Sequence, residues 1–280
     1  MIPVILFFLG GILLGAFLVW VVLLRVRREC VRLDEEKQLL EQQKKSVDNF
    51  MHNLVGAIGE GVGREELFHR IAHTAVHSIG AMRACVYECM DGGRLRGAAV
   101  EGLFPPQRRQ PFDPDSNNET RARFLEKVLR SEILEPGEGV VGEVARTGKP
   151  VIIQDAVNDP RIARHADPAL AVRSIIFSPM RFDDQTIGVL AVANPSNGLP
   201  FTENDFSLVT SLAEQASLAV RNSDVMHLRI EKTRLEMDLS LASNVQALFL
   251  TEKYPLAKDL DVDARYIPSS QVSGDFYDFH

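Results

Sequence analysis

The sequence predicts an α+β protein in which long helices flank a domain of mixed helices and strands. Three observations support this prediction. An uncharged apolar run opens the chain, apolar residues recur at heptad spacing near both ends, and five apolar runs of strand length lie between turn residues in the middle. We divide the chain into five parts: 1–24, a transmembrane helix; 25–58, a coiled-coil stalk; 59–224, the mixed domain; 225–252, a linker helix; and 253–280, the start of a further domain.

The composition limits the class of function. The chain has 280 residues, of which 45% are hydrophobic and 25% charged, and its net charge is −7. This size allows one or two domains. A nucleic-acid partner is not expected, because phosphate binding needs a basic stripe. The three cysteines form no disulfide framework, and Cys85 and Cys89 are interpreted as core residues rather than as a metal or redox pair.

Residues Ile2 to Leu24 form the uncharged run. At ~1.5 Å per residue a helix of this length reaches about 35 Å, enough for a hydrocarbon core of ~30 Å. Arg25, Arg27 and Arg28 follow at once and nothing basic precedes the run, so the positive-inside rule places the N-terminus outside and the rest of the chain in the cytoplasm. The alternative, a cleaved signal peptide, lacks its basic start and its cleavage site.

A helical stalk is expected after the arginines. Apolar residues recur every seven positions, while the partner positions of the seam are half polar at the start. A parallel homodimer through this stalk is the first interpretation, and a solitary amphipathic helix is the alternative. Glycines at 59, 61 and 63 end the helix. The seam residues are Val26, Leu33, Leu40, Val47 and Leu54, with Cys30, Lys37, Lys44, Met51 and Ile58 at the partner positions.

The middle of the chain alternates helices and strands. We expect helices at 64–80, 121–131 and 137–150, and a long helix from Thr202, its N-cap, to about Leu250. Strands are expected at 85–90, 95–100, 151–153, 174–181 and 187–194, in a sheet covered on both faces. His69, His73 and His77 share one helix face near Glu66 and could bind a metal, but a solvated polar face is the simpler interpretation.

A series of motifs in this region resembles the GAF family of sensor domains, over roughly residues 49–224. The resemblance implies an antiparallel sheet flanked by helices, with a small-molecule pocket over one sheet face. The motifs are Gly139-Val140-Val141-Gly142-Glu143-Val144-Ala145, Gly148-Lys149-Pro150-Val151-Ile152-Ile153-Gln154-Asp155, Asn158-Asp159-Pro160-Arg161, Arg173-Ser174-Ile175, Ile187-Gly188-Val189-Leu190, Phe201-Thr202-Glu203-Asn204-Asp205 and Leu212-Ala213-Glu214-Gln215-Ala216.

The GAF ligand is not identified by the resemblance. Cyclic-nucleotide-binding members carry N-K-x(n)-F-x3-D-E, and Asn194, Phe201 and Asp205 match this pattern. Pro195 stands at the Lys position and Phe206 at the Glu position, so the family's Lys–Asp ion pair cannot form and cyclic-nucleotide binding is disfavoured. No cysteine suits a bilin. His165 is the one candidate haem ligand near the expected pocket, and an exposed loop histidine is the simpler interpretation.

A second apolar seam runs at 3-4-3-4 spacing from Val209 to Asn244, which is typical of a signal-transmitting coiled coil or of a plain spacer helix. Residues 236–280 then resemble the start of SpoIIE-like PPM-type phosphatases, in Ala264-Arg265-Tyr266-Ile267-Pro268 and Val272-Ser273-Gly274-Asp275-Phe276-Tyr277-Asp278. Ser273 stands where the family usually has Gly. The resemblance implies that Asp275, and more weakly Asp278, would help to hold two Mn²⁺ or Mg²⁺ ions that activate a water against phosphoserine or phosphothreonine.

Two functions follow as expectations. In the first, a membrane-anchored GAF sensor regulates a metal-dependent serine/threonine phosphatase acting on a phosphoserine regulatory protein. The 280 residues would then be the amino-terminal part of a longer protein and inactive alone, because a single carboxylate cannot hold two metal ions. In the second, ligand binding or dimerisation by the GAF domain is the whole function, without enzymatic activity.

Overall fold

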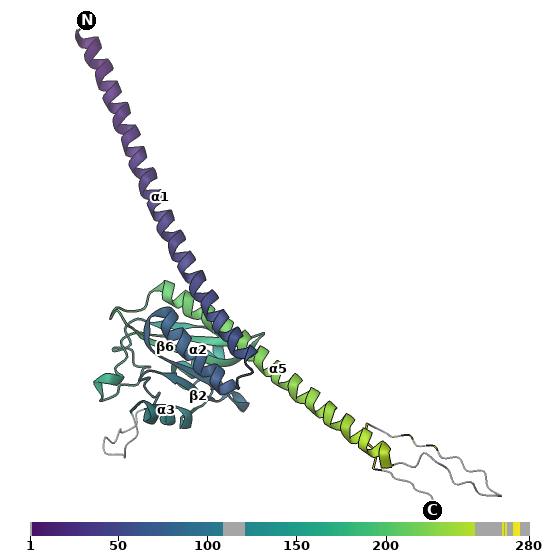
Figure 1. Cartoon of the computed structure of the whole chain (residues 1–280). Helices are drawn as coiled ribbons and strands as arrows, with labels where there is room; N and C mark the ends of the chain where they lie inside the picture. Colours follow the sequence, from purple (N-terminus) through teal and green to yellow (C-terminus); the bar gives the residue numbers. More distant parts are fainter. Residues whose placement is uncertain (1, 109–120, 250–264, 266, 268–270, 275–280) are drawn as a thin grey trace, which may run out of the picture. The chain divides into compact units, whose positions relative to one another are not determined.

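The structure is a computed structural model that describes residues 2–108, 121–249, 265, 267 and 271–274 (Figure 1). For residues 2–19, 21, 22, 35 and 39 it describes the backbone only. The chain divides into two compact units, residues 1–219 and 220–280, and each is described by itself. The elements are α1 (Ile2–Gly59), α2 (Arg64–Ile79), β1 (Ala81–Cys89), the 3₁₀ turn η1 (Asp91–Gly93), β2 (Leu95–Glu101), α3 (Arg121–Ser131), β3 (Ile133–Leu134), α4 (Gly139–Thr147), β4 (Val151–Ile153), the 3₁₀ turn η2 (Pro168–Leu170), β5 (Ile175–Phe182), β6 (Gln185–Pro195) and α5 (Glu203–Phe249).

A six-stranded sheet forms the centre of the first unit. Its strand order is β3-β2-β1-β6-β5-β4, and every neighbouring pair is antiparallel. The expected antiparallel sheet flanked by helices is therefore confirmed. The five predicted strands and the helices at 64–80, 121–131 and 137–150 are present within a few residues of their expected ends. The two-residue strand β3 was not predicted.

Helices cover both faces of this sheet, because strand side chains point alternately to either side. Helix α2 packs on β1 and β2 and is itself covered by the end of α1, whereas α4 packs on β5 and β6 from the other side. Helix α3 lies against β2. Its close approach needs Gly97, because a Cβ there would stand 2.9 Å from the carbonyl oxygen of Leu129. The predicted coverage of both faces is thus observed.

The predicted stalk seam changes its role near the end of α1. Val26, Leu33 and Leu40 are exposed, but Leu54 is fully buried together with Phe50 and Ala57. This part of α1 packs on α2 and lies beside the start of α5, where Gln43 Nε2 donates to the carbonyl oxygen of Asn204 at 3.4 Å (Figure 1). The last turns of α1 therefore belong to the core of the domain, which begins before the expected boundary at residue 59.

The second seam divides in the same way. Val209, Leu212 and Ala216 are fully buried in the first unit, so they pack in the domain core and are not available for a coiled coil. Met226, Ile230 and Met237, in the second unit, are between 48% and 65% exposed. Heptad spacing alone could not separate these parts, because a core-facing helix and a coiled coil place apolar residues at nearly the same spacing.

The structure describes the two ends of the chain only in part. The predicted membrane-spanning run, Ile2–Leu24, forms the first part of α1, but most of its side chains lie outside the described residues. No helix was found, in the part of the chain that the structure describes, with an apolar stretch long enough to cross a membrane. Most of the predicted strands at 264–268 and 272–278 also lie outside the described residues.

Candidate functional site

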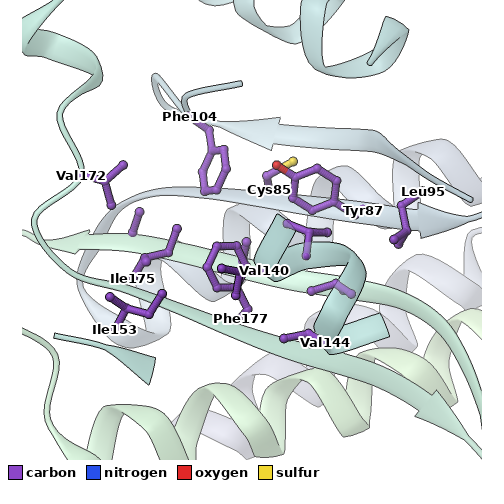
Figure 2. Packing of buried hydrophobic residues seen from close by; sticks show 14 of the residues in the cluster. Cys85, Tyr87, Leu95, Phe104, Val140, Val144, Ile153, Val172, Ile175 and Phe177 are labelled. Carbon is purple, nitrogen blue, oxygen red and sulfur yellow. The ribbon is translucent and has the colours of Figure 1, made fainter. Parts of the chain in front are cut away.

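An apolar cluster fills the sheet face beneath α4 (Figure 2). The figure shows side chains of α4 pointing toward those of the strands, with Phe104 and Val172 at the end of the cluster away from Leu95. The GAF resemblance implied a small-molecule pocket over one sheet face, and this face is packed with side chains. The cluster consists of Cys85, Tyr87, Leu95, Phe104, Leu129, Leu134, Val140, Val141, Val144, Ile153, Ala156, Val172, Ile175, Phe177, Val189, Ala191 and Ala193.

The segment that follows β2, residues 102–108, packs against this face and is held in place by hydrogen bonds; we call it the roof segment. Glu132, only 4% exposed, accepts hydrogen bonds from the backbone N–H groups of Gln107 (2.9 Å) and Arg108 (2.6 Å). The Gln107 amide in turn donates to the buried hydroxyl of Tyr87 at 2.9 Å. Burial raises the pKa of the Glu132 carboxyl, and the two backbone hydrogen bonds oppose this shift. Sequence reasoning missed Glu132, because a single Glu between a helix and a strand carries no local signal.

The β4–β5 loop, residues 154–174, closes the same end of the cluster. His165 Nε2 lies 3.0 Å from the carbonyl oxygen of Pro106, and because a carbonyl only accepts, this ring nitrogen carries the hydrogen. Arg121 pairs with Asp167, whose other oxygen accepts from the backbone N–H of Ala169 at 2.9 Å. His165 thus contacts the roof segment. The residue is half-buried, so the interpretation of His165 as an exposed loop histidine is revised.

A pocket of ≈ 250 Å³ lies within this loop at the edge of the apolar cluster. Ala156 and Val172, both buried cluster residues, form part of its wall, and Ile162 packs against the cluster beside them. No acidic side chain is among the described residues that line it, which are Ala156, Val157, Asn158, Ile162, Ala163, Arg164, His165, Leu170, Ala171 and Val172.

Two of the three residues that match the cyclic-nucleotide pattern, Asn194 and Phe201, hold this loop in place. Asn194, at φ 56°, accepts through Oδ1 from the backbone N–H of Arg173 (2.8 Å) and donates through Nδ2 to the Ala171 carbonyl (2.9 Å). The backbone N–H of Phe201 donates to Ser174 Oγ at 3.1 Å. Asp205 accepts from both the N–H and the hydroxyl of Thr202 at 2.8 Å, which caps α5 as the Thr202 prediction required.

The other candidate residues that the structure describes do not gather into a site. His69 and His73 each face an acid, with Nε2 of His69 3.6 Å from Glu126 and Nδ1 of His73 3.4 Å from Glu101. Among the described residues, no group of three His, Cys, Asp or Glu side chains is placed to hold a metal ion. Cys85 is buried in the apolar cluster, as predicted. Asp275 and Asp278 lie outside the described residues.

Comparison with known proteins identifies the family. The family model described as "GAF domain" matches residues 63–220, which is more than half of the chain. The chain therefore belongs to the GAF family of sensor and regulatory domains, and this part of the predicted resemblance is confirmed.

Two curated relatives are phosphodiesterases. The chain is 31% identical over 225 residues to "Dual 3',5'-cyclic-AMP and -GMP phosphodiesterase 11" of Drosophila melanogaster, across 76% of this chain and 14% of that protein. It is 33% identical over 101 residues to "Dual 3',5'-cyclic-AMP and -GMP phosphodiesterase 11A" of Takifugu rubripes, across 35% of this chain and 11% of that protein. The chain thus spans only about a seventh or less of the length of these relatives.

Two solved GAF domains come from phosphoenolpyruvate-protein phosphotransferases. The one from Coxiella burnetii is 15% identical with a TM-score of 0.49, over 66% of this chain and 98% of that one. The one from Acinetobacter is 18% identical with a TM-score of 0.47, over 63% of this chain and 93% of that one.

Proposed function

We propose that the GAF domain is the small-molecule input module of a membrane-anchored signalling protein. The observation that supports this most directly is the pocket of ≈ 250 Å³ inside the β4–β5 loop. It lies next to the apolar sheet face against which the roof segment packs. Apolar walls with a few placed polar groups are the usual construction of a ligand site. Because Asn194 and Ser174 connect this loop to β6 and to the start of α5, a ligand that moves the loop acts on the sheet and on α5.

A ligand screen with a matched pair of variants tests the input function. Ala163 lines the pocket and is half-buried, whereas Ala169 lies in the same loop and is exposed. We expect some metabolites in a thermal-shift screen of the full chain to raise its Tm. Ala163→Trp should abolish that rise by filling the pocket, and Ala169→Trp should keep it. A screen in which no metabolite shifts the Tm, or in which both variants respond like the wild type, would contradict the input function.

The output proposed for this module is a metal-dependent serine/threonine phosphatase of the SpoIIE-like PPM type. The support is the resemblance of residues 236–280, with Asp275 and more weakly Asp278 as ligands of Mn²⁺ or Mg²⁺ in a complete domain. The substrate proposed for the complete domain is a phosphoserine regulatory protein. In a longer form of the protein with the full domain, Asp275→Asn should remove most Mn²⁺-dependent hydrolysis, since an amide is a poorer ligand for a hard cation. Unchanged activity would contradict the metal role.

We propose a parallel homodimer as the functional state, formed through the parts of α1 and α5 whose apolar residues are exposed. Its support is the exposed apolar residues on both helices, among them Leu33, Leu40, Ile230 and Met237. Isolated exposed apolar residues are common, but a long row of them on a helix is typical of a coiled coil. The second candidate function, a binding or dimerising module with no enzymatic output, rests on these same residues. An output segment that shows no phosphatase activity would favour it.

A further inference from the structure

Arg83 is a buried arginine that has no acidic partner among the described residues. Its side chain sits in β1, and the residue is 6% exposed. In the described part of the chain its guanidinium makes one hydrogen bond, from Nη1 to the Leu103 carbonyl at 2.9 Å, and no ion pair. Burial, and then the nearby charge of Arg173, lower the pKa of Arg83. Buried charges are normally paired because removal from water is costly, so an arginine held in this way is a candidate to pair with an anion.

The sheet register places Arg83 on the sheet face that the pocket borders. Arg83 pairs with Ala193 across β1 and β6, and Ile175 pairs with Ala193 from the other side. Arg83 is two residues from Cys85, so it lies on the cluster face of the sheet. The next residue of β6, Asn194, binds Ala171 and Arg173. Ala171 and the adjoining Val172 line the pocket, so the backbone of Arg83 is one strand away from Asn194, the residue that holds this part of the wall. Arg83 itself is not among the described residues that line the pocket.

Two further arginines lie at this end of the sheet. Arg164 lines the pocket, and Arg173 follows Val172 directly in the chain. Among the described residues neither has an ion-pair partner, and the one side-chain hydrogen bond of Arg173 is to Met82 Sδ at 3.9 Å. The acids of the same loop are engaged elsewhere. Asp155 binds Asn158, Asp159 binds Arg161, and Asp167 binds Arg121.

We propose that this end of the GAF domain binds a small organic anion, with Arg83 as the buried anchor of its carboxylate or phosphate and the pocket holding its apolar part. The inference rests on the proposed small-molecule input and names the chemical class of that ligand. Guanidinium groups suit both anions, because their forked N–H donors match two oxygens at once. The apolar walls at Ile162, Leu170 and Val172 favour an organic body over an inorganic ion.

Benzoate and benzamide form a matched pair of probes, since they share an aromatic body and differ in charge. For the full chain in detergent, we expect benzoate to raise the Tm in a concentration-dependent way and benzamide to leave it unchanged. Arg83→Met keeps the aliphatic volume and removes the charge, and should weaken benzoate binding by about tenfold or more, the loss expected for one charge-assisted hydrogen bond. Arg123→Met, at an exposed position of α3, is the control and should bind benzoate like the wild type.

A second variant covers the case in which Arg83→Met fails to fold. Arg173→Met changes an exposed side chain and should also weaken benzoate binding, by a smaller factor. Equal shifts with benzoate and benzamide, no shift with benzoate, or full benzoate binding by both variants would overturn the anion assignment. A neutral metabolite whose effect is blocked by Ala163→Trp would overturn the anion assignment while the input function stands. A screen without any ligand would overturn both.

Discussion

Two buried serines near the start of β5 differ in their hydrogen bonding. Ser174 Oγ donates to the Ile153 carbonyl at 3.2 Å and accepts from the Phe201 N–H at 3.1 Å. Ser178 is equally buried, but its hydroxyl has no hydrogen-bond partner among the described residues. A buried hydroxyl without a partner costs free energy, whereas one that joins two backbone groups stabilises both.

The two serines should therefore respond oppositely to the same change. Ser174→Ala should lower the free energy of unfolding by about 1–3 kcal/mol, because it leaves a buried N–H and a carbonyl without their hydrogen-bond partner. Ser178→Ala should leave it unchanged or raise it by about 1 kcal/mol, because it removes only a desolvated hydroxyl. Urea denaturation of both variants beside the wild type measures the difference. Equal losses in the two variants would show that Ser178 has a partner after all.

Glu132 should make stability depend on pH. Burial raises the pKa of its carboxyl in the folded state. The folded state then holds the proton at pH values where the unfolded state has lost it, so the stability from this group is complete below the unfolded pKa of about 4.3 and is lost as pH rises through the folded pKa. Glu132→Gln cannot titrate. Its destabilisation relative to wild type should be largest near pH 4 and shrink toward pH 7.

Urea midpoints of the wild type and Glu132→Gln at several pH values provide the measurement, since the other titrating groups cancel in the difference. Arg108→Gln is a useful companion, because the Arg108 side chain binds Glu138 while its backbone N–H binds Glu132. Hydrogen bonds from the Glu135 backbone N–H and then from the Arg108 side chain lower the pKa of Glu138. The destabilisation of Arg108→Gln should therefore grow as pH rises through the carboxylate range, opposite to that of Glu132→Gln. A difference between wild type and Glu132→Gln that grows with pH would mean that the pKa of Glu132 is lowered instead.

At the scale of elements, much of the fold could be predicted from the sequence. Strands β5 and β6 were predictable because each is a largely apolar segment of eight or more residues beside a polar turn at Asp183 and Asp184. Strand β3 was not, because two residues show no alternation. The hydrogen bonds that link Glu132 and His165 to the roof segment were also missed. Each joins groups at least 24 residues apart in the sequence and therefore leaves no local pattern. The role of Arg83 was missed for the same reason, because its hydrogen bond to the Leu103 carbonyl joins residues 20 positions apart.

The divided seam of α5 leads to a prediction about its two parts. Ile230 is 52% exposed, so Ile230→Glu should leave the unfolding of the domain unchanged and should dissociate the proposed dimer. Leu212 is fully buried, so Leu212→Ala should lower the free energy of unfolding by about 2–5 kcal/mol. Sedimentation velocity and urea denaturation of the same two variants separate the effects. A wild-type chain that sediments as a monomer would rule out the dimer.

At the scale of the whole molecule, the cysteines offer a test of the proposed membrane topology. Cys30 is exposed on α1, two residues after the arginines, whereas Cys85 is buried. Cys89 is half-buried, and burial raises the pKa of its thiol to about 11, so little reactive thiolate forms near neutral pH. A maleimide should therefore label the folded chain at Cys30.

If Ile2–Leu24 spans a membrane with the N-terminus outside, Cys30 faces the cytoplasm. A membrane-impermeant maleimide should then label the chain only after the cells are permeabilised, and Cys30→Ser should abolish that labelling. Pro3→Cys on the Cys30→Ser background moves the reporter to the other end of the run and should react in intact cells. Labelling of Cys30 in intact cells would reverse the topology. Recovery of the wild-type chain in the soluble fraction without detergent would contradict the anchor itself.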